Sequence, residues 1–217
     1  MQLLGLLPLC LCLLAVNEGA KTPHPCKSPP LMVGRLSYVN PKGETVVYER
    51  FSYDALARRI RIRAAVTVGN QTIFEDLLLL YQEGVMYEIS YRNETCKKIA
   101  LKTPFQPIEI PSNAHLMGEV ILGSSSAPGM GLLVNVWDGT VPELKANYQL
   151  AFTEFGCLPV SYVYHTKETG MEFASFYDFV LGIEDPNEFI PPPFCNKAEL
   201  RQTGGEKVHD FFRFLGK

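Results

Sequence analysis

The sequence consists largely of short runs in which apolar and polar residues alternate. In RRIRIR, residues 58–63, arginine alternates with isoleucine from Arg59 onward. A period of two places the arginines on one face of a strand and the isoleucines on the other. We therefore expect a half-buried strand whose Arg59, Arg61 and Arg63 turn to solvent or to a partner surface. A modest contact with an anionic partner, such as matrix polysaccharide or lipid head groups, remains open.

The overall charge argues against a nucleic-acid-binding protein. The chain carries 20 Lys and Arg residues against 23 Asp and Glu residues, a formal net charge of -3. Proteins that neutralise many phosphates carry a basic excess, because counterion release supplies much of their affinity. The basic run is therefore better explained as one face of a strand.

Alternating or apolar runs rich in Val, Tyr, Phe and Thr recur along the chain between Gly and Pro residues. This pattern predicts an all-β protein of about ten antiparallel strands. The stretch Leu77–Leu80 is apolar at every position, which predicts a strand buried on both faces. Segment 123–131 (GSSSAPGMG) is expected to be a long hairpin loop, and segments 111–116 and 186–190 could each form a short helical turn.

The N-terminal segment has the features of a secretory signal peptide. Leu3–Val16 is almost wholly apolar, and the run is too short to span a bilayer. We expect a signal segment over residues 1–20, with cleavage between about Ala15 and Ala20. The mature chain is then a secreted single domain over residues 21–217, without a transmembrane segment. Within it we expect residues 26–200 to be ordered and the C-terminal tail to be flexible.

Four cysteines remain after Cys10 and Cys12 are removed with the signal segment. An even number of cysteines in a secreted chain predicts two disulfides. Their spacing leaves all three pairings open. A zinc site is disfavoured, because the mature chain has no Cys-x-x-Cys motif.

Two sequons, Asn70-Gln71-Thr72 and Asn93-Glu94-Thr95, flank apolar runs where turns between strands are expected. In a secreted protein both predict N-glycosylation in surface loops. Chance occurrence of the tripeptide is the alternative.

Catalytic motifs are not found in the sequence. It has no Gly-x-Ser-x-Gly elbow, no His-Glu-x-x-His motif and no phosphate-binding glycine loop. A secreted hydrolase that uses His115 or His165 with a remote carboxylate remains an alternative. The acidic segment GIEDPNEF does not follow a calcium-loop pattern, and a helix that begins after Pro186 with acidic residues at its positive end explains it better.

The chain contains 13 Phe and 10 Tyr residues, more than a small sandwich core needs. The excess could line an apolar cavity or a dimer face, and plain core packing is the alternative for any one residue. The candidate pocket or core residues are Trp137, Phe152, Tyr162, Phe173 and Phe176.

Several segments together resemble the ependymins, a family of secreted glycoproteins first known from fish brain fluid. They are PCKSPPLMVGRLS, EGVMYEI, NETCKK, VNVWDG, VPELKANY, GCLPVSYVYH and FIPPPFC, which occur between Pro25 and Cys195. The resemblance implies two stacked, curved antiparallel sheets around an apolar pocket, similar to bacterial lipoprotein carriers. It also implies that the disulfides pair Cys26 with Cys157 and Cys96 with Cys195.

The resemblance further implies a function. Ependymins are homodimeric glycoproteins of extracellular and cerebrospinal fluid that bind calcium through sialic acids on their N-glycans. They associate with extracellular matrix and take part in neural plasticity and axon regeneration. The matching glycan acceptors here are Asn70 and Asn93, and the protein itself is expected to provide no metal or catalytic site. The alternative function is that of a carrier for a lipid or other apolar ligand between the sheets.

Overall fold

The computed structural model of the chain describes residues 22–39, 45–142, 145–167 and 170–202. The predicted signal segment, with Cys10 and Cys12, and the predicted flexible tail from residue 203 onward lie outside the described residues. Strands make up most of the described part, together with two short 3-10 helices. This confirms the prediction of an all-β protein with one or two short helices.

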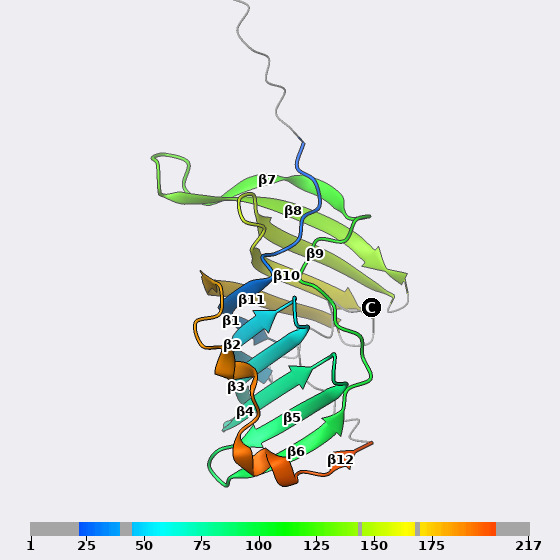
Figure 1. The fold of residues 1–217 in the computed structure, drawn as a ribbon. Helices are drawn as coiled ribbons and strands as arrows, with labels where there is room; N and C mark the ends of the chain where they lie inside the picture. Colours follow the sequence, from blue (N-terminus) through cyan, green and yellow to red (C-terminus); the bar gives the residue numbers. More distant parts are fainter. Residues whose placement is uncertain (1–21, 40–44, 143–144, 168–169, 203–217) are drawn as a thin grey trace, which may run out of the picture.

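The elements follow one another along the chain as an almost unbroken series of strands (Figure 1). Their bounds are β1 (Leu31–Val39), β2 (Thr45–Asp54), β3 (Arg59–Val68), β4 (Gln71–Leu80), β5 (Val85–Ser90), β6 (Thr95–Ala100), β7 (His115–Gly123), β8 (Gly131–Val141), β9 (Ala146–Thr153), β10 (Pro159–Thr166), β11 (Gly170–Leu181), η2 (Pro186–Phe189), η3 (Pro193–Lys197) and β12 (Leu200–Arg201).

The strands form one continuous sheet in the order β12-β6-β5-β4-β3-β2-β1-β11-β10-β9-β8-β7. Strands β1 to β6 pair in chain order, and so do β7 to β11, so the sheet contains two antiparallel meanders. Strand β1 joins the meanders because it pairs with both β2 and β11, with Met32 opposite Leu181 and Val39 opposite Phe173. The two antiparallel sheets that the resemblance implies are therefore the two halves of one continuous twisted sheet (Figure 1).

Strand β3 illustrates how the alternating pattern builds the sheet. Its branched residues Ile60, Ile62 and Val66 are at most 5% exposed and point to one face, which carries the larger apolar cluster. We call this face the inner face of the sheet and the opposite one the outer face. Branched side chains fit the pleated surface well, and a period of two keeps them on one side.

Buried side chains form one large cluster on the inner face and a smaller one on the outer face. The run Leu77–Leu80 in β4 contributes to both. Leu77 and Leu79 belong to the inner cluster, and Leu78 and Leu80 belong to the outer one. The outer cluster is covered by residues of the C-terminal segment, including Phe189 and Cys195. The prediction of a strand buried on both faces is confirmed.

Two disulfides connect distant segments. Cys26 is bonded to Cys157 across a sequence separation of 131, and Cys96 to Cys195 across a separation of 99. The first ties the N-terminal segment to the turn between β9 and β10, and the second ties η3 to β6. This is the pairing that the family resemblance implies.

The two segments expected to form helical turns differ. Segment 186–190 contains η2, whose cap Asp185 accepts a hydrogen bond from the backbone N–H of Asn187 at 2.9 Å. This agrees with a helix start capped by an acidic residue. Segment 111–116 forms only one turn, in which the N–H of Ala114 donates to the carbonyl of Pro111, before β7 begins at His115.

Candidate ligand-binding site

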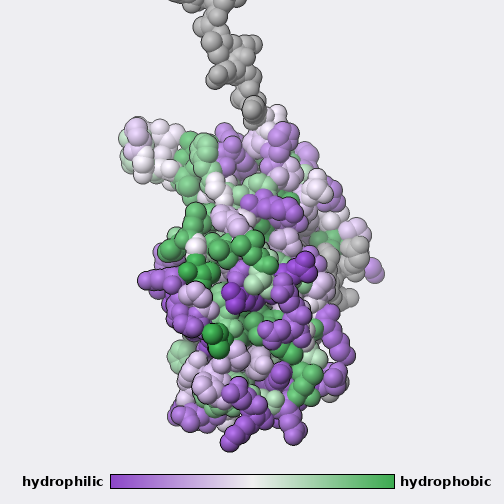
Figure 2. Space-filling model, viewed as in Figure 1, coloured by the Kyte–Doolittle hydropathy of each residue, from purple (hydrophilic) through white to green (hydrophobic). Residues whose placement is uncertain are grey.

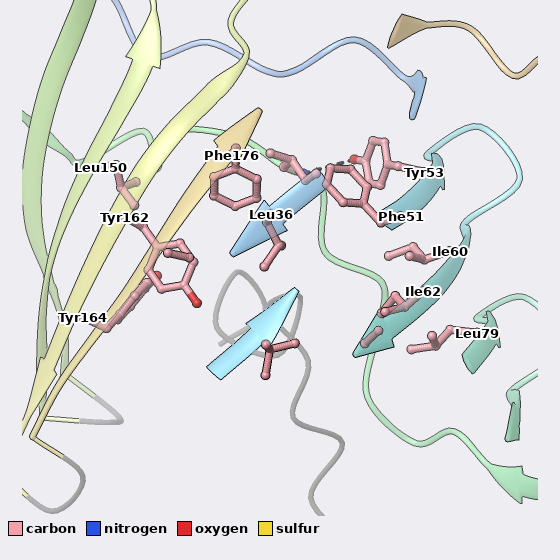
Figure 3. Close-up of a cluster of buried hydrophobic side chains, with 14 of the residues drawn as sticks. Leu36, Phe51, Tyr53, Ile60, Ile62, Leu79, Leu150, Tyr162, Tyr164 and Phe176 are labelled. Atoms are coloured by element: carbon pink, nitrogen blue, oxygen red, sulfur yellow. Dashed lines mark hydrogen bonds between the residues drawn. The ribbon is translucent and has the colours of Figure 1, made fainter. Parts of the chain in front are cut away.

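The candidate site is the inner face of the sheet, where side chains from both meanders meet. Figure 3 shows aromatic and aliphatic residues of β9, β10 and β11 facing those of β2, β3 and β4 across β1. Elements distant in sequence thus contribute to one apolar surface. The labelled members of this cluster are Leu36, Phe51, Tyr53, Ile60, Ile62, Leu79, Leu150, Tyr162, Tyr164 and Phe176.

Four of the five predicted pocket or core residues lie in this inner cluster. Trp137, Phe152 and Tyr162 are each 2% exposed, and Phe176 is 7% exposed. The register explains their proximity, because Trp137 lies opposite Leu150 and Leu150 lies opposite Tyr162 on neighbouring strands. The sequence therefore identified side chains that the fold brings onto one surface.

Phe173 does not belong to this group. Its side chain is 44% exposed, whereas Glu172 and Ala174, the residues next to it in β11, are buried. Alternation along β11 turns Phe173 to the outer face and Phe176, three residues later, to the inner face. The prediction that Phe173 lines the same surface as Phe176 is therefore wrong.

Aromatic rings form a connected wall on the inner face. The ring centroids of Tyr162 and Tyr164 are 5.4 Å apart and those of Tyr162 and Phe176 are 6.1 Å apart. Phe51 meets Phe176 edge to face, with centroids 6.4 Å apart. These separations are typical of favourable aromatic pairs. The wall presents flat apolar surface, and its tyrosines add hydroxyl groups.

Two carboxylates lie within this apolar surface. Glu49 of β2 is 5% exposed and Glu172 of β11 is 7% exposed. The Tyr38 hydroxyl hydrogen bonds to Glu172, and both carboxylates are electrostatic neighbours of Tyr162. We call Tyr38, Glu49, Tyr162, Tyr164 and Glu172 the tyrosine-glutamate cluster. Its polar atoms could orient a polar group of a ligand whose remainder rests on the apolar wall.

The tyrosines of this cluster stay protonated over a wide pH range. Burial, followed by the charge of Glu172 and the hydrogen bond to it, raises the pKa of Tyr38 to about 12. Burial also raises the pKa of Tyr162, and the neighbouring Tyr38, Glu172 and Glu49 raise it further. At neutral pH both hydroxyl groups therefore keep their protons.

Glu49 and Glu172 were not among the predicted site residues, although the sequence pattern contains a signal for both. In TVVYERFSY, Glu49 is two residues from both Val47 and Phe51, so its side chain points to the same face of the strand as theirs. Val47 and Phe51 are both buried on the inner face. Glu172 likewise points to the same face of β11 as the buried Ala174, two residues later. A carboxylate in phase with an apolar row is a recognisable mark of a buried polar group.

One end of the inner face is closed by the N-terminal segment and the segment between β6 and β7. The N–H of Ser28 donates to the carbonyl of Ile108 at 2.9 Å, and the N–H of Ile108 donates to the Tyr53 hydroxyl at 3.0 Å. Phe105 stacks on Tyr53 with centroids 5.8 Å apart. The Cys26–Cys157 bond holds this cap against the second meander.

The outer face of β3 carries the arginines of RRIRIR. The Arg61 side chain is only 3% exposed and is bound by Asp76 through two hydrogen bonds of 2.8 Å. It also donates to the backbone carbonyl of Glu188 at 2.8 Å. Arg59 and Arg63 are 32% and 40% exposed and pair with Asp54 and with Glu188. The prediction that these arginines turn to solvent is therefore wrong for Arg61, whereas Arg59 and Arg63 are partly exposed.

The physical reason is that a distant segment covers this face. After β11 the chain crosses β3 with η2 and reaches β6 with η3 (Figure 1). Burial acts to raise the pKa of Glu188, but hydrogen bonds from Ser52 and Arg63 and the charge of Arg50 lower it overall. The arginines thus fasten the C-terminal segment to the sheet.

Other candidate chemical groups are dispersed. His115 Nδ1 lies 3.0 Å from Asp138 Oδ1, with both side chains largely in solvent at 80% and 47% exposed. His165 and His24 are exposed on other elements, and His209 lies outside the described residues. Within the described ranges, no group of three or more His, Cys, Asp or Glu residues could hold a metal ion.

Both sequons are at the tips of hairpins. Asn70 is exposed in the turn between β3 and β4, and Asn93 is exposed in the turn between β5 and β6. Both are on the first meander. No helix among the described residues is long and apolar enough to cross a membrane.

Comparison with solved structures relates the fold to a bacterial protein. An uncharacterized conserved protein from Thermus thermophilus aligns with a TM-score of 0.51 at 11% identity, covering 81% of this chain and 91% of that one. A LolA superfamily protein from Nitrosomonas europaea aligns with a TM-score of 0.32 at 8% identity, covering 76% and 90% of the two chains. Only the first of these scores indicates a shared fold.

Comparison with known sequences identifies the family. The family model Ependymin matches residues 69–195. Ependymin-2 of Carassius auratus is 36% identical over 201 residues, covering 93% of this chain and 92% of that protein. Ependymin of Notemigonus crysoleucas is 37% identical with the same coverage, and mammalian ependymin-related protein 1 of Rattus norvegicus is 29% identical over 87% of this chain and 84% of its own. The chain therefore belongs to the ependymin family.

Proposed function

We propose that this protein is a secreted carrier that binds a lipid or other amphiphilic ligand against the inner face of its sheet. The observation that carries the proposal is the tyrosine-glutamate cluster within the apolar wall. Ligand sites in proteins are mostly apolar surfaces with a few well-placed polar groups. The ligand's chain would lie along the aromatic wall, and its head group would hydrogen bond to the cluster.

Secretion is supported by two features of the chain. The N-terminal segment has the composition of a signal peptide, and the two disulfides suit an oxidising compartment. The first meander presents both glycan acceptors at hairpin tips. We therefore place the protein in extracellular fluid.

Ligand carriage is tested on protein freshly purified from the medium of secreting cells. Native mass spectrometry should show extra mass that disappears on denaturation, and organic extraction should recover an amphiphile. In Tyr162→Phe, which removes one hydroxyl at nearly constant volume, retention of amphiphiles should fall while retention of hydrocarbon probes persists. The matched control is Tyr177→Phe on the outer face, where the side chain is 37% exposed. Unliganded wild-type protein would contradict carriage.

A second proposal, motivated by the family, concerns calcium. The glycans on Asn70 and Asn93 would bind calcium through sialic acid carboxylates, which are oxygen ligands of the type that calcium prefers. The proposal is supported by the exposure of both acceptors at hairpin tips. Calorimetric titration before and after enzymatic removal of sialic acid tests it. Calcium binding should be lost with the sialic acid, and unchanged binding would contradict the glycan mechanism.

We also propose the family's role in cell-matrix adhesion and neural plasticity or axon regeneration, carried out as a homodimer that acts by binding and not by catalysis. Immobilised matrix proteins should retain the sialylated protein in the presence of calcium and release it with a chelator. Retention that depends on neither calcium nor sialic acid would contradict the linked mechanism.

The assignment as a binding protein and not an enzyme has its own test. Turnover of ester, glycoside or peptide substrates that is lost in the His115→Gln variant would contradict this assignment.

A further inference from the structure

Three arginines lie side by side across neighbouring strands of the sheet. In the strand register Arg35 of β1 lies opposite Arg50 of β2, and Arg50 lies opposite Arg63 of β3. We call these three residues the arginine row. Neighbouring strands are about 4.8 Å apart, so the row crosses the sheet within about 10 Å. Like charges directly opposite one another destabilise a sheet, so the row needs negative charge beside it.

The arginine row is on the outer face and is open to solvent. The residue that follows each arginine belongs to the inner cluster, so alternation along the strands turns all three arginines outward. Their side chains are 59%, 51% and 40% exposed, in the order β1 to β3. Figure 2 shows strongly hydrophilic side chains over the middle of the molecule, at the level of β1 to β3 in Figure 1. A ligand in solution can therefore reach the row.

Arg35 and Arg50 have only long ion pairs among the described residues. Arg35 Nη1 is 3.6 Å from Asp178 Oδ2, and Arg50 Nη2 is 4.0 Å from Glu188 Oε1. The same Glu188 oxygen is held more closely by Arg63, at 3.0 Å. Charge-assisted hydrogen bonds between arginine and a carboxylate are about 2.7 to 2.9 Å long. Both guanidinium groups therefore keep hydrogen-bond donors for a further partner.

The charges around the row do not balance within the described part of the chain. Four guanidinium groups, those of the row and of Arg61, share three carboxylates, so one positive charge remains. The carboxylates are those of Asp76, Asp178 and Glu188. The net charge of the whole chain is -3, but charges further than about 8 Å away are largely screened at physiological ionic strength. The local surplus therefore favours an anion at the row.

The surroundings of the row indicate which anion fits. Guanidinium groups bind oxyanions through two parallel hydrogen bonds. Tyr177 lies opposite Arg35 and is 37% exposed, and Tyr48 is two residues from Arg50 on the same face and is 57% exposed. Their flat rings offer apolar surface on which a sugar ring can stack, and their hydroxyl groups can hydrogen bond to it. A sulfated sugar chain contacts the guanidinium groups and the rings together.

An anionic lipid surface fits the row less well than a narrow sugar chain does. Helix η2 lies on the outer face directly beside the row, because its Glu188 contacts both Arg50 and Arg63. A flat bilayer would meet this raised segment before it reached the strands. The exposed acidic residues Glu184 and Asp185, which precede η2, would repel such a surface as well. A chain one sugar wide can follow the arginines past this segment.

We propose that the arginine row binds a sulfated polysaccharide, with Arg35 and Arg50 as its main contacts. A sulfate group accepts hydrogen bonds from both guanidinium groups, and neighbouring sugar rings rest on Tyr48 and Tyr177. Arg63 adds positive charge while it stays bonded to the protein's own carboxylates. The site is on the opposite face from the candidate ligand site and uses neither glycans nor calcium, so it does not depend on the functions proposed above.

The proposal is tested by isothermal titration of the secreted full-length protein with a short heparin oligosaccharide at physiological ionic strength. The protein is treated with sialidase and kept in a chelator, so that neither sialic acid nor calcium contributes. In Arg35→Gln/Arg50→Gln the dissociation constant should rise at least about tenfold. The matched control is Arg58→Gln/Arg201→Gln, which removes the same charge from exposed arginines in the β2–β3 turn and in β12. This control should bind as wild-type protein does.

The same titration with a desulfated oligosaccharide of equal length should give at least about tenfold weaker binding. Arg35→Lys/Arg50→Lys keeps both charges without the planar fork, so its affinity should fall between those of wild-type protein and the Gln variant. This variant decides the outcome if the Gln variant does not fold.

Four results would overturn the proposal. They are no binding by wild-type protein, equal affinity in the Gln variant, an equal loss in the control, and binding that does not depend on sulfate. Wild-type protein that floats with phosphatidylserine vesicles but does not bind the oligosaccharide would identify a lipid surface as the ligand instead. Native masses of the same samples report ligand retention on the inner face separately.

Discussion

Replacing Arg61 by Met tests whether the basic run of β3 is structural. The Arg61 side chain is 3% exposed, and its guanidinium makes two 2.8 Å hydrogen bonds to Asp76 and donates to the Glu188 carbonyl. Met fills similar volume but removes every donor. The Asp76 side chain, 13% exposed, then loses its two-point partner, and among the described residues Arg63, with Nε at 3.5 Å, remains as its ion-pair partner.

Removing one partner of a buried ion pair typically costs about 3 to 5 kcal/mol. The remaining contact with Arg63 places the expected loss near the lower end, about 3 kcal/mol. For a chain of this size that loss lowers the melting temperature by about 6 to 12 °C. Differential scanning calorimetry and urea unfolding of the secreted protein measure both quantities.

Two comparisons make this prediction specific. Arg35→Met removes a pair that is 3.6 Å long and exposed on both sides, at 59% and 63%, and should cost less than about 1 kcal/mol. Adding Asp76→Leu to Arg61→Met should recover part of the loss, because the uncompensated charge is removed. An Arg61→Met protein as stable as Arg35→Met, or a double variant less stable than Arg61→Met, would refute the reasoning.

Three further predictions follow from the inner face and the disulfides. Gly34→Ala should lose about 1 to 3 kcal/mol in urea unfolding, because its methyl group would lie 2.7 Å from a buried phenylalanine ring, whereas Gly118→Ala, with nothing within 4 Å, should change little. The folded protein holds the Tyr38 proton more tightly because the pKa of Tyr38 is raised, so the Tyr38 contribution to the free energy of unfolding should be constant between neutral pH and pH 10.0 and should fall as pH rises towards about 12. The alkaline fall should be less steep in Tyr38→Phe, and an equally steep fall in that variant would contradict this. Replacing Cys96 and Cys195 together by Ser should cost about 4 to 5 kcal/mol, given their separation of 99 residues, and a loss below about 1 kcal/mol would refute the loop-closure argument.

The fold class could be predicted from the sequence because alternation is a local property. The pattern of β3 places Ile60 and Ile62 on one face without reference to any other part of the chain, and the apolar run Leu77–Leu80 indicates burial on both sides. The number of sheets is not local. It depends on the pairing of β1 with β11, which are about 140 residues apart and carry no signal that identifies them as partners.

The same limit explains the error at Arg61. Alternation determines which face a side chain occupies, but not what covers that face. Here the cover is η2, whose Glu188 lies 127 residues further along the chain than Arg61. The hairpin loop predicted at 123–131 implies a strand before it, but the bounds of β7 were not predicted, since its apolar residues lie on both exposed faces and a bulge interrupts its period.

Within the candidate site, apolar members were easier to predict than polar ones. Trp137, Phe152 and Tyr162 were selected because large aromatic residues are usually buried. Glu49 was passed over because carboxylates are usually exposed, although its position in the alternation placed it inward. Phe173 was included among the predicted pocket or core residues because it is aromatic. Its position in the alternation of β11 turns its side chain to the outer face, away from the candidate site.

The central claim, that the inner face binds an amphiphile, is tested most directly by the fluorescence of Trp137, the only tryptophan in the chain. Trp137 is 2% exposed and belongs to the inner cluster. Delipidated, refolded protein should be titrated with a fatty acid that carries bromine on its chain, with the unbrominated acid as control. We predict saturable quenching by the brominated acid alone, with about one acid bound per chain. Trp137 emission that stays unchanged in the correctly folded protein would contradict it.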